Sequence, residues 1–159
     1  MVASTRRREH SKKLREYARF LRDDHDWDYA YILRVLRYKL ERTRRCIVSN
    51  DLVQSASKIG RQISRVEGLL ERVIDDKYVE EIGVSFYAKY GRPRMLVGRA
   101  AKGERSAPVT IKFAKETVRN SEKLRRRHHA LVAKADRMRR RDLATAFRIM
   151  EKHIWGWWD

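Results

Sequence analysis

Two runs of apolar residues dominate the pattern of this chain. Between Asp26 and Val73, apolar side chains recur every three or four residues, which is the period of one face of an α-helix. The polar segment Ser49-Asn50-Asp51 separates the two runs. The first run comprises Tyr29, Leu33, Leu36, Leu40, Thr43 and Ile47, and the second comprises Leu52, Ala56, Ile59, Ile63, Val66, Leu70 and Val73. Two amphipathic helices joined by a short polar segment predict an antiparallel helical hairpin.

Both ends of the chain also have helical patterns. Residues 1–22 have a short apolar face made of Leu14, Tyr17, Ala18 and Leu21. Near the C-terminus, the first apolar line comprises Leu124, Leu131, Ala135 and Met138, and the second comprises Leu143, Phe147, Met150, Ile154 and Trp157. The second line is displaced by one position, which predicts a kink or a new helix near residues 139–142, capped by Asp142.

The helical pattern stops between Ile82 and Ile111. This segment contains four glycines and both prolines, namely Gly83, Gly91, Gly98, Gly103, Pro93 and Pro108. We expect a long loop over residues 82–111, in which Val84–Tyr90 and Arg94–Val97 could pair as short strands turning at Gly91-Arg92-Pro93. The predicted fold class is mainly α, an antiparallel bundle of four to five helices with one long Gly/Pro-containing loop and room for a short β-hairpin.

Length and composition are consistent with one ordinary domain. A chain of 159 residues with 42% hydrophobic side chains can bury a single core, so we expect a single domain spanning residues 1–159. No apolar run approaches the roughly 20 residues that cross a bilayer, and no signal-peptide core is evident, so no membrane partner is expected. Cys46, the single cysteine, cannot form an internal disulfide, which fits a reducing cytosol.

Charge is the outlying property of the composition. Lysine and arginine number 39 against 21 aspartates and glutamates, a formal net charge of +18. Because like charges repel in a compact chain, such an excess favours a negatively charged partner. The excess is also segregated: residues 119–141 contain ten cations and two acids, whereas residues 51–81 contain five cations and seven acids. Such segregation predicts a binding face, with a solvated helix face as the alternative.

The densest cationic segment yields the first candidate binding residues. Lys123, Arg127, Lys134, Arg137 and Arg141 fall on one helical stripe along which phosphates could lie. The candidates from this segment are Arg119, Lys123, Arg126, Arg127, Lys134, Arg137, Arg140 and Arg141.

Further candidates lie in three other segments. Residues 1–13 are expected to form a basic arm that frays. In the 82–111 segment, aromatic rings beside cations could stack on bases, and an equally good interpretation places these rings in the core. The candidates are Arg6, Arg7 and Arg8 in the arm, Arg44 and Arg45 in the first helix of the hairpin, and Arg92, Arg94, Tyr87 and Tyr90 in the loop.

Two groups of titratable residues invite a catalytic interpretation. The acidic segment Asp23–Asp28 surrounds His25 and could hold a metal, but a helix start capped by Asp26 is favoured because no second ligand group is evident. His128 and His129 are adjacent, so on a helix they point about a quarter turn apart and cannot chelate one ion together. We therefore predict no catalytic residue, no metal and no cofactor, with a metal-dependent nuclease as the minority hypothesis.

Two short motifs carry a resemblance. The helix start His25-Asp26-Trp27-Asp28-Tyr29, together with the ending Trp157-Trp158-Asp159, resembles small uncharacterised proteins encoded by tailed bacteriophages. The resemblance covers residues 24–73 and the last few residues, about a third of the chain. It implies a phage origin and the cytoplasm of an infected bacterium, and it carries over no activity and no functional residue.

The first functional hypothesis is a non-enzymatic nucleic-acid-binding protein, for RNA or DNA, that contacts phosphates through helices rich in arginine and lysine. The alternative is a phage protein that binds a host defence or regulatory protein, or sequesters a signalling nucleotide, with the same cations. The terminal segment Trp155-Gly156-Trp157-Trp158 is expected to be a hydrophobic plug closing over Trp27, and an exposed cluster there would indicate a protein partner.

Overall fold

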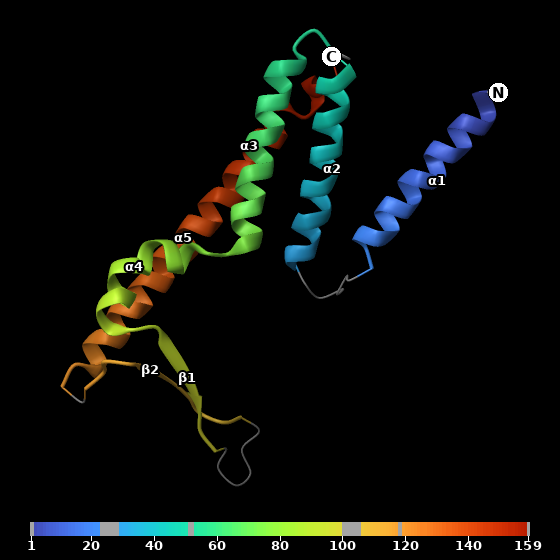
Figure 1. Cartoon of the computed structure of the whole chain (residues 1–159). Helices are drawn as coiled ribbons and strands as arrows, with labels where there is room; N and C mark the ends of the chain where they lie inside the picture. Colours follow the sequence, from blue (N-terminus) through green and yellow to red (C-terminus); the bar gives the residue numbers. More distant parts are fainter. Residues whose placement is uncertain (1, 23–28, 51–52, 100–105, 118, 159) are drawn as a thin grey trace. The chain divides into compact units, whose positions relative to one another are not determined.

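The computed structural model of the chain describes residues 2–22, 29–50, 53–99, 106–117 and 119–158, without the side chains of residues 2–9 and 29 (Figure 1). The described chain is mainly α-helical with one antiparallel two-stranded sheet, which confirms the predicted fold class. Its elements are α1 (Val2–Phe20), α2 (Tyr29–Asn50), α3 (Ala56–Asp75), α4 (Tyr78–Tyr90), β1 (Pro93–Val97), β2 (Val109–Phe113), α5 (Ser121–His153) and the 3-10 helix η1 (Trp155–Trp157).

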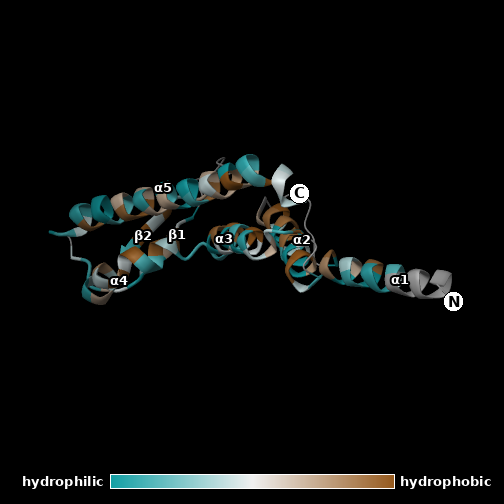
Figure 2. Cartoon of the chain, turned by 90° about the horizontal axis from the view of Figure 1, so that it is seen from above, coloured by the Kyte–Doolittle hydropathy of each residue, from teal (hydrophilic) through white to brown (hydrophobic). Residues whose placement is uncertain are grey.

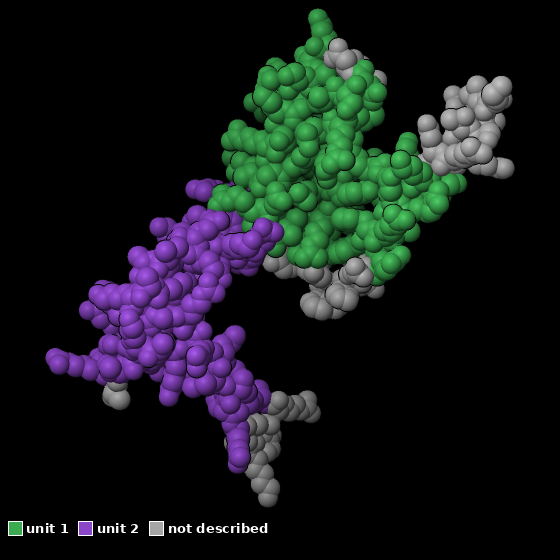
Figure 3. Space-filling model, viewed as in Figure 1, with its two compact units in different colours: residues 1–74, 145–159 green, residues 75–144 purple. Residues whose placement is uncertain are grey.

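The chain divides into two compact units (Figure 3). Unit 1 contains residues 1–74 and 145–159, and unit 2 contains residues 75–144. This division does not decide whether the chain folds cooperatively, so the expectation of a single domain stays a prediction.

The predicted helical hairpin is the centre of unit 1. Most described members of the two apolar runs are buried, including Leu33, Leu40 and Ile47 on α2 and every member on α3, and Leu36 is half-buried. Figure 2 shows hydrophobic residues, in brown, on both of these helices. Arg44 pairs with Glu67 at 3.0 Å and Arg37 pairs with Glu71 at 2.9 Å, so residue numbers fall along α2 as they rise along α3, as an antiparallel pair requires.

Helix α1 contacts α2 through part of the predicted face and through Phe20. The ring of Tyr17, a member of the predicted face, meets Tyr38 edge-on with centroids 5.5 Å apart. Leu14 and Leu21 are exposed, whereas the ring of Phe20 stacks on Tyr38 with centroids 4.5 Å apart. The Tyr31 hydroxyl donates a hydrogen bond to the Phe20 carbonyl, and Arg42 pairs with Glu16.

Residues 2–13 of the predicted arm are helical, and the fraying of this arm stays a prediction. The acidic segment 23–28, with its cap and metal alternatives, lies outside the described residues.

The C-terminal tryptophans divide into two environments. Trp157 is buried in unit 1, and its Nε1–H donates a hydrogen bond to Gln62 Oε1 at 3.2 Å. Trp155 and Trp158 are exposed. One tryptophan is therefore a plug, and Trp27, its expected neighbour, lies outside the described residues.

The first element of unit 2 is the helix α4, where a strand was predicted. The predicted strand Val84–Tyr90 is wrong, because these residues belong to α4, and the expected 82–111 loop begins only after Tyr90. Aromatic and β-branched residues favour a strand locally, but burial of one helical face overrides that preference. Gly83 does not break the helix; it is buried beneath the Tyr87 ring, whose Cε2 would lie 2.6 Å from an added Cβ.

The β-hairpin has a different partner from the one expected. Strand β1 overlaps the predicted strand Arg94–Val97, but it pairs with β2, with Pro93 opposite Phe113 and Val97 opposite Val109. The predicted turn at Gly91-Arg92-Pro93 is wrong. Gly91 ends α4 in the left-handed region, at φ +79°, and its N–H donates to the Tyr87 carbonyl.

Helix α5 is uninterrupted, so the predicted new helix with its Asp142 cap is wrong, and the alternative of a kink stays a prediction. Asp142 lies in mid-helix, 3% exposed, and accepts a hydrogen bond from the buried Tyr78 hydroxyl at 3.1 Å. The buried positions of α5 keep one helical spacing, because Leu124, Ala135, Asp142 and Ala146 are all buried on the same face, and Phe147 of the predicted second line is exposed.

Candidate nucleic-acid interface

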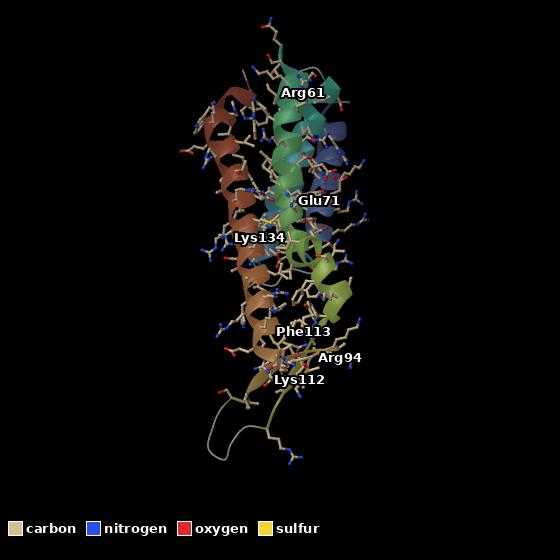
Figure 4. The ribbon with its side chains drawn as sticks, turned by 90° about the vertical axis from the view of Figure 1, so that its left-hand side faces the viewer. Arg61, Glu71, Arg94, Lys112, Phe113 and Lys134 are labelled. Atoms are coloured by element: carbon tan, nitrogen blue, oxygen red, sulfur yellow. The ribbon has the colours of Figure 1, made fainter. Side chains whose placement is uncertain are left out.

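Four exposed cations follow one side of α5 within unit 2. Lys123, Arg127, Lys134 and Arg137, hereafter the α5 strip, are all exposed, and Figure 4 labels Lys134 among them. At about 100° per residue they fall within a sector of roughly 80°, and at about 1.5 Å per residue they extend over about 21 Å. The helix thus presents a continuous row of positive charge.

The acids of the same helix segment lie beside this row and pair with other arginines. Glu122 pairs with Arg126 one turn away, and Asp136 pairs with Arg139 and Arg140, both at 2.8 Å. The hydrogen bond from Arg139 lowers the pKa of Asp136, so this carboxylate stays charged at neutral pH. Arg126 and Arg140, both candidates from the sequence, are therefore partly neutralised.

The α5 strip itself retains its charge. Among the residues that the structure describes, no carboxylate lies within ion-pair distance of Lys123, Arg127, Lys134 or Arg137. Arg127 lies 3.5 Å from the Tyr90 hydroxyl. Arg141, the fifth member of the predicted stripe, is exposed but contacts the buried carboxylate of Asp142 at 3.4 Å.

The aromatic candidates lie on α4 and not on a strand. Tyr87 and Tyr90 are half-buried, and both belong to a cluster around Phe86, which contacts Phe113 at 5.5 Å between centroids. Burial raises the pKa of Tyr87. The rings take part in the core of unit 2, and base stacking by Tyr87 and Tyr90 stays a prediction.

The remaining candidates are distributed over both units. Arg119, Arg92 and Arg94 are exposed in unit 2. In unit 1, Arg44 is occupied by Glu67 and Arg45 by Glu41, so neither is as available as the α5 strip. Arg6, Arg7 and Arg8 lie on α1, and their side chains are not described.

The sequence interpretation missed Lys112, the one cation of β2. Lys112 is exposed and lies opposite Arg94 in the hairpin, with Phe113 next to it (Figure 4). The alternation of apolar and polar residues in Val109–Phe113 is the signal that could have identified this strand and its outward lysine.

A cavity of about 270 Å³ lies between β2 and α5. It is lined by Val109, Thr110, Ile111, Arg125, His128 and His129. Arg125 is engaged by Glu116 at 3.3 Å, and burial lowers the pKa of His128, which is therefore neutral at pH 7. Ligand pockets usually enclose about 300–1,000 Å³. This cavity is slightly smaller than that range.

The described part of the chain offers neither a metal-ligand cluster nor a membrane-spanning helix. There, no group of three or more His, Cys, Asp or Glu side chains could hold a metal ion. None of the described helices has the length and apolar character of a membrane span. No protein-family model, no curated protein and no solved structure matches this chain.

Proposed function

We propose that this protein binds RNA or DNA without catalysing a reaction and contacts phosphates through the α5 strip. One observation carries the proposal: four exposed cations share one side of the α5 segment in unit 2, whose acids, Glu122, Asp136 and Asp142, have other partners. A face that only keeps a protein dissolved usually mixes both signs. A row without acids attracts a polyanion and releases its counterions, which drives binding. A phage origin and action in an infected bacterial cytoplasm remain expectations drawn from the resemblance.

The test is the salt dependence of binding by the full chain. Log affinity for duplex DNA should fall linearly with log salt, with a slope of about −0.9 per phosphate contacted. Replacing all four strip residues, in K123Q/R127Q/K134Q/R137Q, should reduce the magnitude of this slope by about 3 to 4. Fluorescence anisotropy with a labelled duplex measures both quantities.

A charge-matched variant controls for net charge. K39Q/K58Q/R61Q/R65Q removes two lysines and two arginines that are exposed in unit 1. Its slope should stay close to that of the wild type. A flat salt dependence of the wild type, or equal losses in both variants, would contradict the proposal. A cleaved product after incubation with Mg²⁺ or Mn²⁺ would establish a nuclease instead.

Binding to a host protein is a second candidate, favoured by the exposed end of unit 1. Trp155 is 85% exposed, and Phe147, Ile154 and Trp158 nearby in sequence are exposed as well. Exposed tryptophan is typical of protein interfaces. This candidate, or sequestration of a signalling nucleotide, requires tight binding to one defined ligand that excess duplex DNA or RNA does not displace, measurable by calorimetry.

A further inference from the structure

The β-hairpin of unit 2 has two chemically different faces. Residues opposite each other in an antiparallel pair share a face, and the faces alternate along each strand. The register therefore places Met95 with Ile111 and Val97 with Val109 on one side. The other side has Arg94 with Lys112 and Leu96 with Thr110. One face is apolar and the other is largely polar and cationic.

Three of the six residues on the apolar face are exposed, and Pro93 and Ile111 are half-buried. At its base, Phe113 is buried against Phe86 and His128. Farther along the strands, Met95 is 73% exposed, Val97 71% and Val109 58%. Figure 1 shows the two strands extending away from α4 and α5. A two-stranded hairpin is marginal by itself, and an apolar face left in water stabilises neither strand until something covers it.

The charge around this face selects the kind of partner. The described hairpin segments, 91–99 and 106–115, contain no carboxylate and five exposed cations, which are Arg92, Arg94, Arg99, Lys112 and Lys115. A second copy of the chain would bring an equal cationic set against this one, and like charges oppose that contact. A phosphate-bearing partner with an apolar groove satisfies both properties.

On the basis of the proposed function, we propose that the partner is duplex DNA and that the hairpin inserts its apolar face into the minor groove. The deoxyribose walls of that groove cover apolar side chains, and Met95 can act as a wedge between base steps. The surrounding cations then reach the phosphates on both sides of the groove. Wedge insertion bends the duplex, by about 20–90° in proteins that use this mode.

Duplex RNA is a poor match for the same surface. Its minor groove is wide and shallow and is lined by 2′-hydroxyls, which an apolar face leaves without hydrogen-bond partners. Five-residue strands span about 17 Å, which is about half a helical turn of B-DNA, so one hairpin can fill a single groove segment.

The test uses the full chain and the variant M95T/V97T/V109T. Threonine keeps the β-branched shape of Val97 and Val109 and favours a strand at position 95, so the hairpin can form. We expect the affinity for duplex DNA to fall by about tenfold or more. The salt slope should be unchanged, because no phosphate contact is removed. The bend, measured by energy transfer between dyes at the two duplex ends, should disappear.

A matched control replaces exposed apolar residues outside the hairpin. I32T/V84T/V132T alters three side chains that are likewise exposed, and it should bind and bend DNA as the wild type does. Wild-type affinity for an RNA duplex of the same sequence should be weaker than for DNA and equal in both variants. Circular dichroism verifies that each variant is folded.

The outcomes separate this inference from the proposed function. If the wild type shows salt-dependent binding but M95T/V97T/V109T binds and bends DNA normally, only the hairpin proposal is overturned. Equal binding of RNA and DNA duplexes, or a dimer in sedimentation that the triple variant dissociates without changing its DNA affinity, overturns it as well. If the wild type binds no nucleic acid, both proposals fail.

Discussion

At the scale of single residues, the two adjacent histidines of α5 lie in different surroundings. His128 is buried among the rings of Phe86, Tyr87 and Phe113 in unit 2, while its neighbour His129 is exposed. The adjacent pair looks like a catalytic motif in the sequence. The structure separates the two residues because neighbours on a helix point in different directions.

The buried histidine should make stability depend on pH. Burial lowers the pKa of His128 below its ordinary value of 6.5, with a smaller contribution from His129. The unfolded chain therefore binds more protons than the folded chain as the pH falls. Neutral His128 contributes its full share of folding stability above pH 6.5, and this contribution is lost as the pH falls below that value. H128Q should flatten the fall in the free energy of unfolding between about pH 7 and pH 5, measured by urea denaturation.

H129Q provides the control, because this exposed side chain makes only the smaller contribution. Its pH dependence should remain close to that of the wild type. If both variants keep the full wild-type dependence, another group is responsible.

At the scale of elements, two glycines of α3 differ in how closely other atoms approach them, although nothing in the sequence distinguishes them. Gly60 is buried where α3 meets α2, and an added Cβ would lie 2.7 Å from Val48 Cγ2. Gly68 has nothing within 4 Å of that position. The first glycine permits a close approach of helices, whereas the second only weakens its helix.

G68A should raise the free energy of unfolding by about 0.5–1 kcal/mol, because alanine loses less backbone entropy in a helix. G60A should show no such gain and should destabilise by about 1–3 kcal/mol if Val48 cannot move aside. Urea denaturation of both variants provides the measurement. Equal stabilisation by the two substitutions would show that the close approach at Gly60 is not a constraint.

At the scale of the whole molecule, the C-terminal 3-10 helix packs on the distant helix α3 in unit 1. Trp157 is 2% exposed and bonds to Gln62 on α3, which lies 95 residues earlier. Trp155, two residues before it, is almost fully exposed. The last turn of the chain is therefore part of the core of a unit that begins at the N-terminus.

W157A should lower the free energy of unfolding by about 3–5 kcal/mol, because it empties a large core site and leaves Gln62 without this bond. W155A should change it by less than about 0.5 kcal/mol. Thermal or chemical denaturation followed by circular dichroism compares the two. Similar effects of both substitutions would contradict the different roles of these neighbouring tryptophans.

The sequence by itself determined the features that depend on local periodicity. The seams of α2 and α3 could be identified because burying one side of a helix imposes a fixed spacing on apolar residues. The exposure of Lys123, Arg127, Lys134 and Arg137 followed in the same way, since charged side chains are rarely buried without partners.

Only the tertiary structure decided the features that depend on distant neighbours. Whether Val84–Tyr90 is helix or strand, which segment pairs with β1, and whether Asp142 caps a helix or bonds to Tyr78 each depend on contacts between segments far apart in sequence. Local preferences differ by about 1 kcal/mol or less, and tertiary burial outweighs them. The partners of the arginines were undetermined for the same reason, because an ion pair such as Arg44 with Glu67 exists only once two helices have packed.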